Sequence, residues 1–209
     1  MSSPATVRPG REWGRIGLLG GSFNPAHAGH LHLSLAALKR LELDAVWWLV
    51  SPQNPLKSAK DMAPLAARMA SAKAAARHPR IQVSDMETAF GTTYTAETLA
   101  LMRRRFPRAR FVWLMGADNL MQIPRWAKWT RIFEQTPVAV VARPAYSWNV
   151  MHGKAALRYG SARIGDRAAT RLARKRPPAW TYLATRLHPA SATEIRAGRQ
   201  TPFGGPKGY

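Results

Sequence analysis

The stretch GGSFNPAHAGH, residues 20–30, follows directly on the apolar run of residues 16–19, and it decides how the rest of the chain is interpreted. The apolar run predicts a buried strand, and the two glycines mark its end. In open parallel sheets, ligands bind beyond the carboxyl ends of the strands, where this stretch falls. Backbone amides at the start of a following helix would form a positive pole for phosphate. The stretch therefore indicates a phosphate-binding loop, with a simple glycine–proline turn as the alternative.

Two histidines, His27 and His30, flank Gly29 within this stretch. We expect the glycine to leave room for a phosphate between the two rings. Imidazoles can donate hydrogen bonds to phosphoryl oxygens and stabilise the charge that develops as a bond to phosphorus breaks. A metal pair is another use of closely spaced histidines, but a zinc site needs a third ligand. None of the other histidines has a ligand spacing, so phosphate binding is the favoured interpretation.

Strand and helix patterns alternate along the chain around this stretch. Apolar runs predict strands at residues 15–20, 45–50, 81–83, 109–115, 137–142 and 180–185. Helical spacing predicts helices at residues 30–41, 61–77, 95–105, 126–134 and 191–197. Such alternation is typical of a parallel sheet with helices on both faces. The expected fold class is therefore α/β, with a Rossmann-like, doubly wound parallel sheet.

The length of 209 residues fits one domain, which we place at residues 14–198. Residues 1–13 are expected to form a disordered arm, and the glycine-rich residues 199–209 a flexible tail. Residues 146–178 interrupt the alternation and carry eight Lys and Arg residues against one acid, Asp166. We expect this segment to be a basic, partly helical excursion within the domain.

The composition limits the classes of function. The chain has no cysteine, which excludes disulfides, thiolate metal sites and a cysteine nucleophile. It has no apolar run of the roughly 20 residues that span a bilayer and no secretory signal at its start, so we expect a cytoplasmic protein without membrane contact. The net charge of +21 attracts polyanions. A protein that binds nucleic acid and uses an enzyme fold that has lost its catalytic activity is therefore an alternative. A run of charged residues, however, is usually only a solvated face.

The complete string carries an H-x-G-H motif, His27 to His30, and resembles the phosphate-binding loop of the nucleotidyltransferase superfamily. Further segments follow in order: SPQNPLK at residues 51–57, GTTYTAETL at 91–99, GADNL at 116–120, Trp126, ARP at 142–144 and SATEIR at 191–196. This succession resembles the bacterial nicotinate-nucleotide adenylyltransferases over residues 15–198. Class I aminoacyl-tRNA synthetases would carry a KMSKS-like loop, which this sequence lacks, and pantetheine-phosphate adenylyltransferases are shorter.

The resemblance implies a reaction in NAD biosynthesis, in which the phosphate of nicotinate mononucleotide attacks the α-phosphorus of ATP and gives deamido-NAD and pyrophosphate. ATP and nicotinate mononucleotide are then the partners, Mg²⁺ arrives on ATP, and nicotinamide mononucleotide is the alternative acceptor. A phosphate monoester is already a nucleophile at neutral pH, so no covalent intermediate is expected. Nucleic acid is not expected as a partner despite the charge, and the protein could form a homodimer.

The resemblance also implies roles for residues by position. It implies four catalytic residues at the phosphates: His27, His30, Lys57 and Arg196. The ATP-binding set that it implies has eight further members: Gly20, Gly21, Ser22, Phe23, Gly116, Asp118, Ser191 and Thr193. Thr95 and Trp126 are expected on the nicotinate side, and no residue is expected to hold a metal ion.

Several of these residues have a simpler interpretation when they are taken alone. Lys57 could be a solvated surface lysine, Asp118 a helix cap and Trp126 a core side chain. Thr193 could be an ordinary helix cap, and Arg143 either serves the phosphates or only ends the fifth strand. The order of the motifs favours the functional interpretation over these alternatives.

Overall fold

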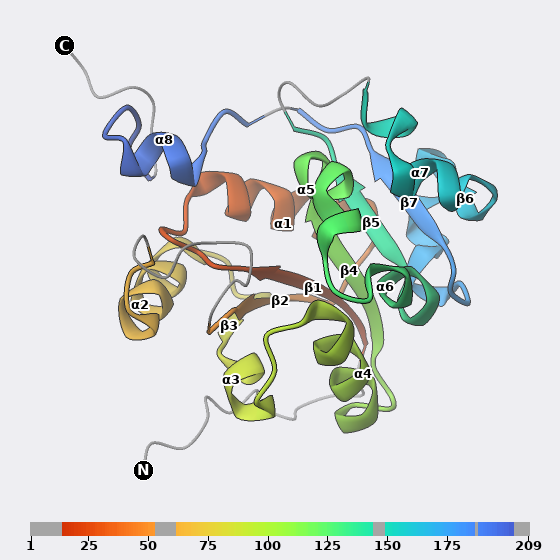
Figure 1. Ribbon diagram of the computed structural model, residues 1–209, viewed down its shortest axis with the longest axis horizontal. Helices are drawn as coiled ribbons and strands as arrows, with labels where there is room; N and C mark the ends of the chain where they lie inside the picture. The colour runs from red at the N-terminus through yellow and green to blue at the C-terminus, as the bar shows by residue number, and fades with distance from the viewer. Residues whose placement is uncertain (1–13, 53–61, 144–148, 187, 203–209) are drawn as a thin grey trace.

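The computed structural model describes residues 14–52, 62–143, 149–186 and 188–202 (Figure 1). In this part of the chain, one sheet of seven parallel strands has the order β3-β2-β1-β4-β5-β7-β6. The strands are Arg15–Gly21 (β1), Ala45–Val50 (β2), Ile81–Ser84 (β3), Arg110–Gly116 (β4), Val138–Val141 (β5), Arg163–Ile164 (β6) and Trp180–Leu183 (β7). This sheet confirms the expected α/β class.

Helices fill the connections between the strands. The α-helices are Ala28–Arg40 (α1), Leu65–Ala75 (α2), Met86–Phe90 (α3), Thr95–Arg105 (α4), Ala117–Gln122 (α5), Trp129–Gln135 (α6), Lys154–Arg158 (α7) and Ala192–Arg196 (α8). The 3₁₀ helices include Ile123–Arg125 (η2), Asn149–His152 (η3), Gly160–Ala162 (η4) and Asp166–Arg174 (η5). Each expected strand and helix is found, β2 and α4 with the expected bounds and the others with one or both ends displaced by a few residues, whereas α3, α5 and β6 were not expected. None of the helices described is long and apolar enough to cross a membrane.

The side chains of the strands alternate between two apolar layers, one on each face of the sheet. In β2, Trp47 belongs to one layer and Trp48 to the other, as the two-residue period of a strand requires. Residues of α1 and α2 join the layer of Trp48, and residues of α4 and α6 join the layer of Trp47. Because both faces are covered, the strands have nearly continuous apolar sequences.

The strand order reverses at β1. This strand pairs with β2 on one side and with β4 on the other. In sheets of this order, ligands bind beyond the carboxyl ends of the two strands that flank the reversal. The segments that leave those ends follow Gly21 in β1 and Gly116 in β4. They are the loops in which the expected phosphate and ribose contacts lie.

The basic excursion is part of the covering of the sheet. Leu157 is exposed, but seven of its apolar residues are buried, first in the layer of α4 and then in the layer of α1: Val150, Ala155, Ala156, Tyr159, Ala169, Leu172 and Ala173. Every Lys and Arg from residue 154 to residue 176 is exposed. Arg40 in α1 pairs with Asp166 at 2.5 Å between Nη2 and Oδ1. The segment therefore carries the chain from β5 to β7 over the sheet, with its charges facing outward.

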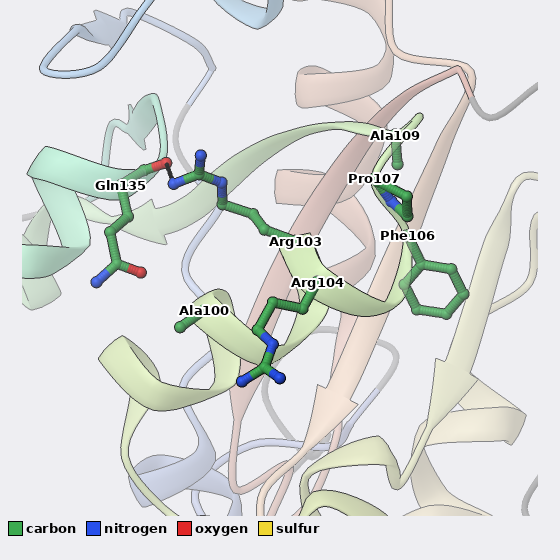
Figure 2. A pocket seen from close by; sticks show the side chains of 7 residues that line it. All are labelled: Ala100, Arg103, Arg104, Phe106, Pro107, Ala109 and Gln135. Atoms are coloured by element: carbon green, nitrogen blue, oxygen red, sulfur yellow. Dashed lines mark hydrogen bonds between the residues drawn. The ribbon is translucent and has the colours of Figure 1, made fainter.

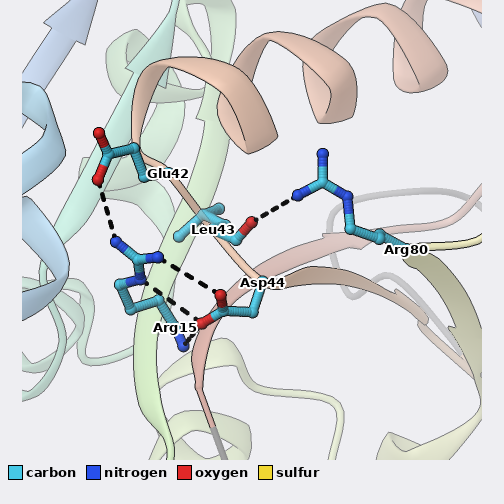
Figure 3. A network of polar contacts seen from close by, with 5 residues as sticks. All are labelled: Arg15, Glu42, Leu43, Asp44 and Arg80. Atoms are coloured by element: carbon cyan, nitrogen blue, oxygen red, sulfur yellow. Dashed lines mark hydrogen bonds and ion pairs between the residues drawn. The ribbon is translucent and has the colours of Figure 1, made fainter.

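A polar network fixes β1 against β2 at their amino ends (Figure 3). The backbone N–H of Arg15 donates to Oδ2 of Asp44 at 2.7 Å, and its guanidinium donates to Oε2 of Glu42 at 3.2 Å. Nearby, Nη1 of Arg80 donates to the carbonyl oxygen of Leu43 at 3.2 Å. These contacts lie at the end of the sheet opposite to the loop after β1.

Candidate active site

The loop after β1 turns at Phe23. Phe23 has a left-handed backbone with φ 46°, a conformation that costs a bulky residue about 1–3 kcal/mol. Its ring is buried and stacks on Trp48, with 5.0 Å between the ring centroids and an interplanar angle of 18°. Burial of the ring offsets the cost and fixes the backbone of Ser22 and Phe23, whose expected place near the ATP phosphates rests on the family resemblance.

His27 and His30 both use Nδ1 to cap α1. The backbone N–H of Gly29 donates to Nδ1 of His27 at 3.1 Å. The backbone N–H of His27 donates to Nδ1 of His30 at 3.2 Å. A neutral imidazole whose Nδ1 accepts a hydrogen bond carries its proton on Nε2. The caps therefore set the tautomer, and each ring has an Nε2–H that can donate to an anion.

The two rings pack against each other, which corrects one expectation. Their centroids are 3.9 Å apart with an interplanar angle of 40°, so no phosphate fits between them. The glycine of the motif is needed for another reason. A Cβ on Gly29 would lie 2.9 Å from Cε1 of His27 and 3.1 Å from the carbonyl oxygen of Ala190. A phosphate would therefore meet the edges of the rings, and Gly29 lets the chain at Ala190 approach the start of α1.

His27 is neutral at neutral pH. Burial lowers the pKa of His27 from 6.5 to about 4, and the positive charges of Arg143 and His188 act in the same direction. Both of these side chains therefore lie near the H-x-G-H motif. A neutral His27 can donate a hydrogen bond but supplies no net charge, so the positive charge that ATP requires must come from other side chains.

The low pKa of His27 makes the stability of the fold depend on pH. The unfolded chain binds a proton at His27 below about pH 6.5, whereas the folded chain binds it only below about pH 4. His27 should thus make its full contribution to the free energy of unfolding above about pH 6.5. The free energy of unfolding should fall by about 3 kcal/mol as the pH drops from about 6.5 to about 4. Urea unfolding at about pH 7, 5.5 and 4.5 would measure the loss. The variant His27→Asn keeps an acceptor for the helix cap but has no imidazole to titrate, so its free energy of unfolding should fall less over the same pH range. An equal fall in the variant and the wild type would show that His27 is not the cause.

The C-terminal motif lies against the loop after β1. Arg196 donates from Nη1 to the carbonyl oxygen of Asn24 at 2.6 Å. The backbone N–H of Ala28 donates to the carbonyl oxygen of Pro202 at 2.8 Å. Figure 1 shows α8 beside the amino end of α1. The structure therefore brings Arg196 to the loop that carries the two histidines.

Ser191 and Thr193 lie at the start of α8. Ser191 is the N-cap residue, so Thr193, which is exposed, is not the ordinary cap of this helix. The backbone N–H of Ser191 donates to Oε1 of Gln200 at 3.1 Å, and Nε2 of Gln200 donates to the carbonyl oxygen of Pro189 at 3.3 Å. Residues 199–202 of the expected flexible tail are thus held against the domain, and the rest of the tail lies outside the described residues.

Gly116 and Asp118 lie where β4 ends and α5 begins. Arg143, which follows β5, points its Nε at Oδ1 of Asp118 at 3.5 Å. A Cβ on Gly116 would overlap both of these side chains, so the glycine permits the ion pair. The N-cap of α5 is Gly116, and Asp118 is not the cap that its simpler interpretation proposed. The positive charge of Arg143 also helps to lower the pKa of His27.

The residues expected on the nicotinate side occupy neighbouring elements. Thr95 is the first residue of α4, and Trp126 follows η2, half-buried against the apolar layer of α4. An ion pair of 3.0 Å between Nζ of Lys128, the N-cap residue of α6, and Oε1 of Glu97 links α4 to the segment that follows η2. Trp126 is thus partly a core side chain, as its simpler interpretation held. Lys57 lies outside the described residues.

The two glycines that end β1 have different surroundings. A Cβ on Gly20 would overlap the ring of Trp113 on β4, whereas a Cβ on Gly21 would find its nearest atom, in the ring of Phe23, at 3.4 Å. Close packing between β1 and β4 therefore explains Gly20 without a ligand. Contact of either glycine with ATP stays a prediction.

Two surface hollows lie away from this loop. One of about 550 Å³ is lined by Ala100, Arg103, Arg104, Phe106, Pro107, Ala109 and Gln135 (Figure 2). In it, Nη1 of Arg103 donates to the carbonyl oxygen of Gln135 at 3.0 Å. The other, of about 510 Å³, includes Arg15 and Asp44. Both lie at the amino ends of the strands, opposite to the end at which parallel sheets bind ligands. Across the described ranges, no three His, Asp or Glu side chains gather as metal ligands would.

Two basic residues near the site were missed in the sequence. His188 carries no motif, and only the fold places it near His27. Arg68 is 2% exposed and donates to the carbonyl oxygens of Ser22 and Ser51. A signal for Arg68 existed, because it shares the buried stripe of α2 with Ala72 at i+4. A charged residue at a core position calls for an explanation.

The sheet order and the position of the two imidazoles define an α/β nucleotidyltransferase. Residues 18–198 match the family model described as cytidylyltransferase-like, and the chain belongs to this family. Within it, the chain is 52% identical over 182 residues to a probable nicotinate-nucleotide adenylyltransferase of Cereibacter sphaeroides, covering 87% of this chain and 96% of that one. The corresponding protein of Ruegeria pomeroyi is 50% identical over 191 residues, covering 91% and 88%. The resemblance drawn from the motifs is confirmed.

Solved structures confirm the fold independently of sequence. The nicotinic acid mononucleotide adenylyltransferase of Plasmodium falciparum complexed with NaAD superposes with a TM-score of 0.66 at 15% identity, covering 91% of this chain and 86% of that one. The same enzyme complexed with APC gives a TM-score of 0.64 at 14% identity, covering 89% and 84%. At this identity the likeness bears on the fold alone.

Proposed function

We propose that this protein is a nicotinate-nucleotide adenylyltransferase, which transfers AMP from ATP to nicotinate mononucleotide and forms deamido-NAD and pyrophosphate in NAD biosynthesis. The observation that carries the proposal is the convergence of His27, His30 and Arg196 on the loop after β1. Relatives that are 50–52% identical over most of the chain carry the name of this activity. The site and the relatives thus point to one reaction.

The reaction needs positioning and charge more than it needs a base. Both reactants are anions, and the charge on the phosphoryl oxygens grows as the bond to pyrophosphate breaks. His27 and His30 would donate to these oxygens from Nε2. Arg196, anchored on the carbonyl of Asn24, and Lys57 would supply positive charge. The acceptor phosphate attacks directly, so the chain needs no nucleophile of its own and no covalent intermediate forms.

The other residues would hold the substrates in line. The backbone of Ser22 and Phe23 would face the α-phosphate, and Asp118 would accept hydrogen bonds from the ribose of ATP. Thr95 and Trp126 would contact the nicotinate. Mg²⁺ enters as part of the ATP substrate and neutralises phosphate charge there. A homodimer, a cytoplasmic location and the exclusion of nucleic acid as a partner stay predictions.

The choice of acceptor is the sharpest test of this proposal. The purified protein, given ATP, Mg²⁺ and nicotinate mononucleotide, is expected to release pyrophosphate together with deamido-NAD. We expect a higher kcat/KM for this acceptor than for nicotinamide mononucleotide, measured in one coupled pyrophosphate assay. No release above a His30→Ala control would reject the activity, and a preference for the amide would change the acceptor.

A further inference from the structure

Arg68 in α2 is a buried guanidinium that contacts the loops on the phosphate side of the candidate site. Only 2% of the residue is exposed. Its Nη1 donates to the carbonyl oxygens of Ser22 at 2.9 Å and Ser51 at 2.6 Å, and its Nη2 to that of Pro52 at 2.9 Å. Its Nε donates to the carbonyl oxygen of Ala63 at 2.9 Å. One side chain thus joins the loop after β1, the loop after β2 and the turn before α2.

All four contacts go to backbone carbonyls, and no ion pair of Arg68 with a carboxylate is found in the described part of the chain. Burying a guanidinium is costly, and a hydrophobic residue at this position of the helix would avoid that cost. Neighbouring contacts hold the same loop: the backbone N–H of Ala26 donates to Oγ of Ser71 at 3.1 Å. The arrangement points to a requirement on the geometry of the loop.

The contact with Ser22 determines where the next amide points. The Ser22–Phe23 peptide bond is trans, and in a trans peptide the C=O and the following N–H point in opposite directions. Since Arg68 holds the C=O of Ser22 toward α2, the N–H of Phe23 is directed away from α2. A fixed amide is a stronger anion donor than a mobile one, because it needs no reorganisation when the ligand binds.

We propose that Arg68 is a positioning residue of the adenylyl-transfer site, which fixes the backbone after β1 and β2 so that the Phe23 amide meets the phosphates of ATP. This proposal rests on the proposed function, because the proposed function is what places the phosphates of ATP at the loop after β1. Arg68 itself does not touch the substrate. Its effect should therefore fall on the phosphate-bearing part of ATP and spare the adenosine part.

Nucleotide affinity without turnover tests this role. Binding of ATP with Mg²⁺ and of adenosine is measured by titration calorimetry, in the absence of an acceptor, on the wild-type protein and on Arg68→Gln and Arg68→Lys. In Arg68→Gln, the Kd for ATP should rise by about tenfold or more, while the Kd for adenosine changes by less than about twofold. Arg68→Lys keeps the charge but not the planar fork of donors, so its Kd for ATP should lie between those of the wild-type protein and Arg68→Gln.

Arg80→Gln is the matched control. Arg80 also donates to a backbone carbonyl next to β2, that of Leu43, but this residue precedes the strand, whereas the carbonyls of Ser51 and Pro52 that Arg68 holds follow it (Figure 3). Arg80→Gln should bind ATP like the wild type. Wild-type affinity for ATP in Arg68→Gln, or an equal loss for ATP and adenosine, would overturn the proposal. Failure of the wild-type protein to bind ATP would instead reject the proposed function.

The variants are compared at a temperature at which circular dichroism shows them folded. If neither variant folds, NMR relaxation of the wild-type protein decides the question. High order parameters of the backbone amides at residues 22–24 before ATP is added would support a loop fixed in advance by Arg68. Low order parameters that rise only with ATP would overturn it, because the nucleotide would then order the loop.

Discussion

The variant His30→Ala is expected to lose about a hundred- to a thousandfold or more in kcat while its free energy of unfolding falls by only about 1 kcal/mol. The Nε2–H of His30 is assigned to the phosphoryl oxygens, where charge develops in the transition state. The smaller loss has a separate cause, because Nδ1 of His30 accepts from the backbone N–H of His27 and caps α1. Pyrophosphate release and urea unfolding measure the two effects.

The variant His30→Asn separates the cap from the chemistry. Its Oδ1 can accept the same backbone N–H, but the side chain has no donor at the position of Nε2. We expect nearly wild-type stability and a turnover as low as that of the alanine variant. A large fall in melting temperature in both variants, or substantial turnover in His30→Asn, would assign His30 to the structure instead.

The variant Gly20→Ala is expected to destabilise the fold by about 3 kcal/mol. The strand places a Cβ at this position against the buried ring of Trp113, closer than real Cβ atoms approach their neighbours. The backbone of Gly20 is ordinary extended strand, so the loss comes from the contact and not from the torsion angles. Urea unfolding at neutral pH gives the free energy.

A second substitution should relieve this contact. Trp113→Phe removes the overlapping part of the ring. Among the described residues, Nε1 of Trp113 has no hydrogen-bond partner, so the change leaves no acceptor unsatisfied there. In Gly20→Ala/Trp113→Phe, the combined loss should be smaller than the sum of the two single losses by about 1 kcal/mol or more. Additive losses would show that the ring moves freely and that packing does not require Gly20.

Much of the fold could be predicted because its signals are local. Apolar runs such as Ala45–Val50 mark strands buried on both faces, and the sheet order follows the expected doubly wound class. β6 was missed because its two residues, Arg163 and Ile164, carry no pattern. They become a strand only because β7 offers an edge with which to pair.

The site could be predicted in its motifs but not in its geometry. The H-x-G-H string and Arg196 were identified from the resemblance of their motifs to those of the family, and the structure brings them to one loop. The expected gap between the rings of His27 and His30 was wrong, because their shared role as caps of α1 draws the rings together. Arg68 was overlooked because its hydrogen bonds reach loops that are distant in sequence.

The sequence by itself determined the class of fold, the family and the residue types available for phosphate, since periodicity and motif order are properties of neighbours along the chain. Only the tertiary structure decided which of those residues meet, that the imidazole of His27 is neutral and which nitrogen carries its proton. These properties depend on burial and on contacts such as that between Arg196 and Asn24, which are 172 residues apart in the sequence. Such contacts exist only once the sheet has brought the carboxyl ends of its strands to one edge.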